Sequence, residues 1–147
     1  MKKGFTLIEY IVTISLIGLL ASAFVLSASN FLPSVRLNGS TNNLTSNLRQ
    51  AQEEAVTAQM RYAVRFNAQT NPTGYQIIKI SADTTEDIVK TVTIPSNLTV
   101  DLDPTIADAE IYFSPDGGPS SFGNITLSSA GKSKVVNISP AGVIKIQ

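Results

Sequence analysis

The spacing of hydrophobic positions changes twice along the chain. Residues 10–35 form an uncharged, mainly apolar stretch, and apolar positions then recur at helical spacing as far as residue 55. This spacing predicts a helix with one apolar stripe, formed by Leu37, Leu44, Leu48, Ala51 and Ala55. From Arg61 onward the period shortens to two, which predicts a series of short strands.

The uncharged stretch is long enough to cross a bilayer, because a membrane-spanning helix takes about 20 apolar residues. Lys2 and Lys3 precede it, and this favours a cytoplasmic N-terminus with the rest of the chain on the other side of the membrane. Glu9 lies at the N-terminal edge of the stretch. A carboxylate there is either solvated among lipid headgroups or paired with another group.

The predicted fold class is α+β, with one long N-terminal helix packed on an antiparallel β head of about eight short strands. We expect a transmembrane helix over residues 5–32, an amphipathic continuation over residues 33–60 and a β-rich globular head over residues 61–147. The acidic segment Ser81–Asp87 is expected to be a loop. The last three strands are expected to form a meander, with turns at Ala130-Gly131 and Pro140-Ala141-Gly142.

Composition excludes several kinds of chemistry. The chain has no His and no Cys, so a His-based triad, a Cys nucleophile and a Cys/His zinc site are all excluded. It has 11 basic and 11 acidic residues, and this balance gives no reason to expect nucleic acid as a partner. We therefore predict no enzyme, no cofactor and no metal site. Calcium binding stays open as an alternative, on the loose acidic group Asp101, Asp103, Asp108, Glu110 and Asp116.

The N-terminal sequence Lys3-Gly4-Phe5-Thr6-Leu7-Ile8-Glu9 and the apolar run after it resemble the cleavage motif of type IV prepilins and type II secretion pseudopilins. The resemblance implies that residues 1–4 are a leader. A prepilin peptidase would cut after Gly4, and the new terminal residue, Phe5, would be N-methylated. Glu9 would guide the subunit into a filament, where its carboxylate pairs with the N-terminal amine of a neighbour.

A second resemblance lies further along the chain. Residues 36–66 are similar to the GspH/FimT class of minor pseudopilins and pilins, on Leu44, Leu48, Arg49, Ala51, Glu54 and Ala55 followed by the strand Arg61-Tyr62-Ala63-Val64-Arg65-Phe66. The element Phe113-Ser114-Pro115-Asp116-Gly117 before the final strands also fits.

Together these resemblances imply a structural, minor subunit of a type II secretion pseudopilus or type IV pilus. The implied partners are the prepilin peptidase, other pilin or pseudopilin subunits, the membrane and an assembly platform. The implied location is the bacterial inner (cytoplasmic) membrane, with the head on the periplasmic side, and later the assembled pilus or pseudopilus.

Three alternatives stay open at this point: a major pilin, a membrane-anchored enzyme and a DNA-binding minor pilin of a transformation pilus. DNA binding in such pilins uses a basic C-terminal tail, but Gly142–Gln147 holds one lysine and no arginine. Loss of Lys2 and Lys3 with the leader would leave 9 of the 11 basic residues against 11 acidic ones. Both observations weigh against DNA as a partner.

Overall fold

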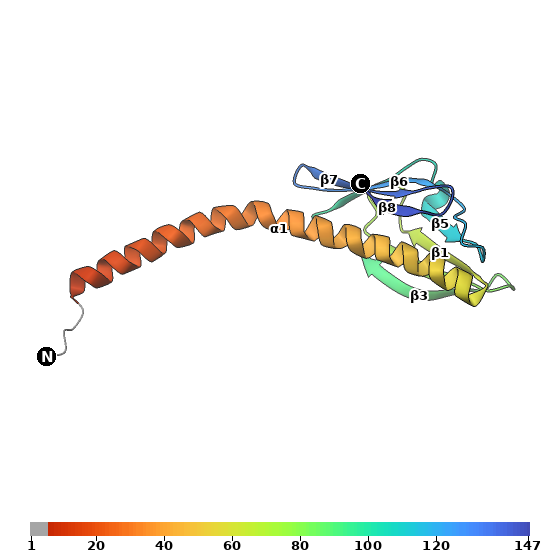
Figure 1. The fold of residues 1–147 in the computed structure, drawn as a ribbon, viewed down its shortest axis with the longest axis horizontal. Coiled ribbons are helices and arrows are strands. Elements are labelled where there is room, and N and C mark those ends of the chain that lie inside the picture. The colour runs from red at the N-terminus through yellow and green to blue at the C-terminus, as the bar shows by residue number, and fades with distance from the viewer. Residues whose placement is uncertain (1–5) are drawn as a thin grey trace. The chain divides into compact units, whose positions relative to one another are not determined.

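The computed structural model describes residues 6–147, except that the side chains of residues 23–30 lie outside that description. The described residues form one α-helix followed by eight strands, which confirms the predicted α+β class (Figure 1). The elements are α1 (Leu7–Ala58), β1 (Arg61–Phe66), β2 (Gly74–Ile80), β3 (Glu86–Thr93), β4 (Thr99–Leu102), the 3₁₀ turn η1 (Ala107–Ala109), β5 (Glu110–Phe113), β6 (Gly123–Ser129), β7 (Lys132–Ile138) and β8 (Ile144–Ile146).

Helix α1 continues through Pro33, although proline has no N–H for the helical ladder. Two compact units meet at this residue, and the second of them is Ser34–Gln147. The helix ends where Gln59 takes a positive φ of 53°. The Met60 N–H then donates to the Ala55 carbonyl at 3.3 Å, which satisfies one of the carbonyls left open at the helix end. The chain can thus turn directly into β1.

The first sheet has the strand order β3-β2-β1-β5 and is antiparallel throughout. Strands β1 and β2 form the predicted hairpin, in which Arg61 pairs with Ile80 and Phe66 pairs with Tyr75. The rings of Phe66 and Tyr75 are tilted against each other, with centroids 5.4 Å apart. Alternate residues of β1 therefore supply one apolar face for the core.

Strand β3 begins two residues earlier than the sequence indicates. The prediction of a loop over Ser81–Asp87 is wrong at its end, because Glu86 is the first residue of β3. The ladder with β2 continues this far, with Ile80 opposite Glu86, and Arg65 holds both oxygens of Glu86, at 2.7 and 2.8 Å. The same guanidinium holds Glu110 of β5 at 2.7 Å. These bonds from Arg65 lower the pKa of Glu86 below its usual value.

The second sheet has the order β4-β6-β7-β8, and its last three strands form the predicted meander. Both residues of the β6–β7 turn have positive φ, 49° at Ala130 and 75° at Gly131. This is the backbone that a two-residue hairpin needs to match the twist of its strands. The turn before β8 closes where the Gly142 N–H donates to the Ser139 carbonyl at 2.9 Å.

The apolar stripe of α1 is buried as predicted, and it joins one core cluster with side chains from both sheets. In Figure 1 this half of α1 runs alongside the strands. A position in the stripe that the apolar pattern left out is Thr41, which is fully buried. Its hydroxyl donates to the Leu37 carbonyl at 2.8 Å, so the helix itself satisfies the buried polar group.

Asn47 adds a buried polar contact between α1 and the first sheet. Its amide nitrogen donates to the Tyr75 hydroxyl at 2.6 Å, and its amide oxygen accepts from the Lys90 ammonium at 2.9 Å. Burial raises the pKa of Tyr75, since a phenolate would be poorly solvated there. The network ties one turn of the helix to β2 and β3 together.

We predict that Leu48→Ala lowers the free energy of unfolding by about 2–5 kcal/mol, because Leu48 is fully buried in the core cluster and truncation leaves a cavity. The matched control is Ile88→Ala on β3, where the side chain is 60% exposed and the expected change is within about 0.5 kcal/mol. Urea unfolding followed by tyrosine fluorescence measures both. Equal losses in the two variants would contradict the placement of the core.

Candidate functional site

The start of α1 is closed by a reciprocal pair of side chains. The Glu9 carboxylate accepts from the Thr6 backbone N–H at 3.0 Å and from the Thr6 hydroxyl at 3.1 Å. The Thr6 hydroxyl in turn accepts from the Glu9 N–H at 3.4 Å. This is a capping box, which satisfies N–H groups that the first helical turn leaves unpaired. Glu9 also places negative charge at the positive end of the helix dipole.

The capping box uses only one oxygen of Glu9, Oε2. Among the described residues, the other oxygen, Oε1, has no hydrogen-bond partner, and the side chain is exposed. The predicted cleavage and methylation residues, Gly4 and Phe5, lie outside the described residues.

Apolar side chains surround the first part of α1 on all sides. Every residue over 6–22 is exposed, and the large apolar members of this segment are Leu7, Ile8, Tyr10, Ile11, Val12, Ile14, Leu16, Ile17, Leu19 and Leu20. A helix that is apolar all round is stable in a surrounding of lipid or other helices rather than water. Within the residues that the structure describes, no helix reaches the length and hydropathy that crossing a membrane requires.

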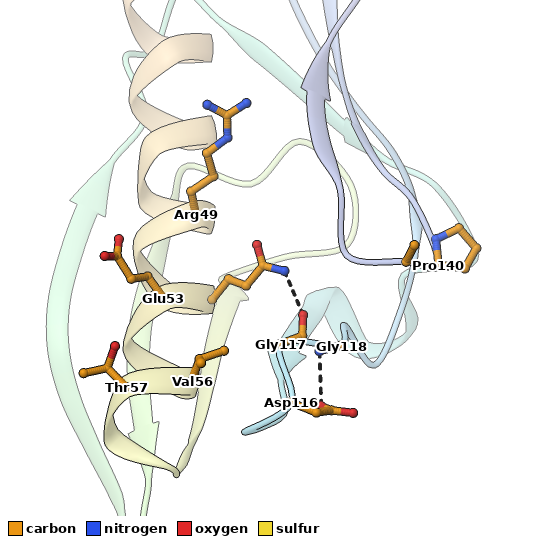
Figure 2. A pocket seen from close by; sticks show the side chains of 10 residues that line it. Arg49, Glu53, Val56, Thr57, Asp116, Gly117, Gly118 and Pro140 are labelled. Carbon is orange, nitrogen blue, oxygen red and sulfur yellow. Dashed lines mark hydrogen bonds between the residues drawn. The ribbon is translucent and has the colours of Figure 1, made fainter.

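The head has its own concave surface, where α1 faces two loops. A cleft of about 560 Å³ lies between helix residues around Glu53 and Val56 and the loop residues Asp116–Gly118, with Pro140 and Ala141 at one side. Figure 2 shows Glu53, Val56 and Thr57 on the helix and Gly117 and Gly118 across from them. Gly118 donates its N–H to the Asp116 carboxylate at 3.2 Å, which fixes the tip of that loop.

Gln52 connects the helix to both loops of this cleft. Its amide nitrogen donates to the Gly117 carbonyl at 2.7 Å and to the Gly142 carbonyl at 3.0 Å. Gly142 has φ 77°, and a Cβ there would lie 2.7 Å from the Gln52 nitrogen. A glycine is therefore needed for this close approach. One side chain of α1 thus holds the turn before β6 and the turn before β8 at once.

Arg49 lies four residues before Glu53, a spacing at which two side chains on a helix can form a surface ion pair. Arg49 instead donates to the Ile144 carbonyl at 2.8 Å, and the two ion pairs among residues 6–147 both belong to Arg65. A carbonyl of β8 thus receives a charge-assisted bond from the helix.

The loose acidic group does not converge. Asp103 accepts from the Thr105 N–H and hydroxyl, Glu110 is held by Arg65, and Asp116 caps its own loop. The bonds from Thr105 lower the pKa of Asp103. No set of three or more potential metal ligands comes together within the described part of the chain. Asp103, Glu110 and Asp116 therefore each have a local structural role.

One sequence signal at the N-terminal site is independent of the hydrophobic periodicity. The spacing Thr6-x-x-Glu9 before an apolar run is the signature of a capping box. Gln52 had no such signal, because a glutamine on a polar helix face is usually solvated. Its role depends on two turns that are 65 and 90 residues away in the chain.

Two family models match the chain. One describes the type II transport protein GspH and matches residues 40–142, and the other describes the prokaryotic N-terminal methylation motif and matches residues 1–25. None of the curated proteins that were compared matches the chain.

Solved structures with the same fold include two kinds of minor subunit. The type IV minor pilin FimU of Pseudomonas aeruginosa is 19% identical, with 80% of this chain and 92% of that chain covered and a TM-score of 0.65. The minor pseudopilin EpsH from the type 2 secretion system of Vibrio cholerae is 14% identical, with 76% and 96% covered and a TM-score of 0.62. At these identities the likeness concerns the fold.

We predict that Gln52→Ala lowers the free energy of unfolding by about 1–3 kcal/mol, because the two carbonyls that it holds lose their donor. The matched control is Gln50→Ala, an exposed glutamine on the same helix, for which the change should stay within about 0.5 kcal/mol. Urea unfolding gives both values. Hydrogen exchange should also show faster opening around Gly117 and Gly142 in Gln52→Ala only, and equal behaviour of the two variants would contradict this role.

Proposed function

We propose that this chain enters its filament as a cleaved, methylated minor subunit. The premise is that the chain belongs to the GspH family of type II transport proteins. It is a structural subunit of the pilin-like kind. The observation that carries the proposal is the start of α1. An exposed carboxylate, Glu9, caps the helix with one of its oxygens and stands directly before a helical segment that is apolar on every side.

The first step of the proposal is processing of the N-terminus. A prepilin peptidase cuts after Gly4, and Phe5 becomes the methylated first residue. The match of residues 1–25 to the N-terminal methylation motif supports this step. Gly4 suits a cleavage site, because a residue without Cβ lets a protease approach the backbone closely.

The second step is insertion and assembly. The apolar segment of α1 is held first by the inner membrane, with the head on the periplasmic side, and then by the corresponding segments of neighbouring subunits. Both surroundings satisfy an all-round apolar helix, which water does not. The chain acts as a building element in this account, while the peptidase and an assembly platform supply the active chemistry.

Glu9 gives the assembly its register. Its Oε1 accepts from the positive N-terminal amine of an adjacent subunit, while Oε2 keeps the capping box with Thr6. A subunit that is shifted along the filament leaves the carboxylate unpaired in an apolar surrounding, at a cost of roughly 2.5–3.5 kcal/mol. The pair thus selects one arrangement against its neighbours.

A role in binding DNA has little support from the head. The C-terminal segment is strand β8 and its flanks rather than a free basic tail, and Lys145 is the one cation within it. Affinity for DNA depends on several cations that neutralise phosphates together.

The experiment that tests this proposal replaces Glu9 by Gln. Glutamine keeps the capping box, because an amide oxygen also accepts from Thr6, but it removes the charge. We expect normal cleavage of Glu9→Gln, while its recovery in sheared filaments falls by more than about tenfold, because an amide cannot form the ion pair. Immunoblots of the membrane and filament fractions measure this.

The control is Thr6→Ala, which removes the cap but keeps the Glu9 carboxylate. Loss of a cap costs about 1 kcal/mol, so filament recovery should fall far less than in Glu9→Gln. If Glu9→Gln assembles like the native chain, charge pairing by Glu9 is excluded.

A further inference from the structure

The acidic residues of the head are confined to the middle of the chain, whereas its basic residues also lie on either side of that stretch. All ten acidic residues beyond Glu9 lie between Glu53 and Asp116. The first turns of the head helix, from Ser34 onward, and the last 31 residues of the chain carry no acid at all. Positive charge there is therefore not balanced by neighbours in the sequence.

Three of these cations lie at the same end of the head, although not all on one face, and we call them the basic end: Arg36, Lys132 and Lys134. Lys132 lies beside the tight turn between β6 and β7, and its ammonium donates to the Ser34 hydroxyl at 2.6 Å. Lys134 points to the same face of β7 as Lys132, because side chains two residues apart share a face. Arg36 is exposed two residues after Ser34. The hydrogen bond thus brings the hairpin turn beside the start of the head helix.

The position of the basic end along the chain is informative. Residues 10–35 have no charge, so Arg36 is the first charged residue after the apolar segment. If this segment lies in the bilayer, as the proposed function holds, the chain reaches the headgroup layer close to Arg36. The bond from Lys132 to Ser34 then keeps the hairpin beside the same layer.

We propose that the basic end binds the anionic phospholipid headgroups of the membrane before the subunit is assembled. This inference rests on the proposed function, because it needs the apolar segment to be in the membrane. Each Lys or Arg near an anionic membrane surface shifts binding by about 1 kcal/mol, which is about fivefold. Three cations suffice to hold the head against the membrane. When the subunit leaves the lipid and joins its neighbours in the filament, the head is released from the headgroups.

We favour lipid over the acidic residues of a neighbouring head as the partner of the basic end, because of where the basic end lies in the chain. The basic end directly follows the apolar segment in the chain, and the hairpin is held there by its own hydrogen bond. An acidic neighbouring head would offer opposite charge, but its position would not be linked to the end of the apolar segment. The two occupants differ in one measurable respect, since contact with lipid depends on lipid charge and contact with a neighbour depends on protein density.

The test uses the full chain in vesicles, with one fluorescent label. The protein has no cysteine, so Ser133→Cys in the exposed part of the hairpin gives a unique labelling position. Vesicles contain either phosphatidylcholine alone or phosphatidylcholine with 30% phosphatidylglycerol, and a quencher attached to the lipid headgroup reports contact. About one anionic lipid in three gives the vesicles a strong negative surface potential. Flotation of the same samples reports insertion.

We expect stronger quenching in the anionic vesicles than in the neutral ones, where the hairpin lies near the headgroups without binding them, and loss of this difference at high salt, where charges are screened. The variant Arg36→Gln/Lys134→Gln keeps the Lys132–Ser34 bond and removes two cations, so the ratio of bound to free hairpin should fall about 25-fold. The control Lys79→Gln/Lys145→Gln removes the same charge elsewhere and should leave quenching unchanged.

Four results overturn the inference. Quenching that is equal in both kinds of vesicle excludes recognition of anionic lipid. A signal that follows the protein-to-lipid ratio instead of lipid charge assigns the basic end to a neighbouring head. A chain that fails to float with vesicles overturns the proposed membrane insertion together with this inference, whereas a chain that floats without quenching overturns the inference alone.

Discussion

Burial of one side of α1 between residues 37 and 55 is the interaction on which the head depends. The two four-stranded sheets share a core with this stripe, and the residues that the structure describes contain no other α-helix to complete it. Leu48, Ala51 and Ala55 are fully buried, so the strands pack close to the helix axis there. The same helix begins in a segment whose apolar side chains have no cover from the described chain. One element therefore serves a globular core and, in the proposed function, a site of assembly.

Apolar contacts alone do not fix the helix in one position. Leucines and alanines repeat along the stripe, so a shift by one turn would still place apolar side chains in the core. Three polar residues remove this freedom: Asn47 bonds to Tyr75, Arg49 to the Ile144 carbonyl and Gln52 to two loop carbonyls. Each bond forms in one position of the helix and leaves an unpaired group in any other. Apolar packing therefore stabilises the head, and these hydrogen bonds select one position of α1 within it.

The sequence predicts the parts of the fold that depend on local periodicity. The apolar stripe, the period of two after Arg61 and the turns of the final meander all follow from neighbours along the chain, and the structure confirms them. Contacts between distant residues are not encoded in this way. Glu86 joins β3 through pairing with Ile80 and is held by Arg65 of β1, and Gln52 bonds to two turns far along the chain.

The N-terminal site shows the same division. The motif around Gly4 and Glu9 points to prepilin processing through its resemblance to the prepilin cleavage motif, and residues 1–25 match the N-terminal methylation motif. The bond between Thr6 and Glu9 adds what the motif alone did not provide, a local task for the carboxylate. The proposed function gives Glu9 an intermolecular role as well, and glutamine separates the two because it keeps the cap and removes the charge.

The central claim is that the chain is a processed filament subunit, and its intact mass after isolation from native membranes tests this most directly. The account predicts a chain that lacks Met1–Gly4 and carries one additional methyl group on Phe5, while a Gly4→Ala variant keeps its full length. An unprocessed native chain, in cells with an active prepilin peptidase, would contradict the account.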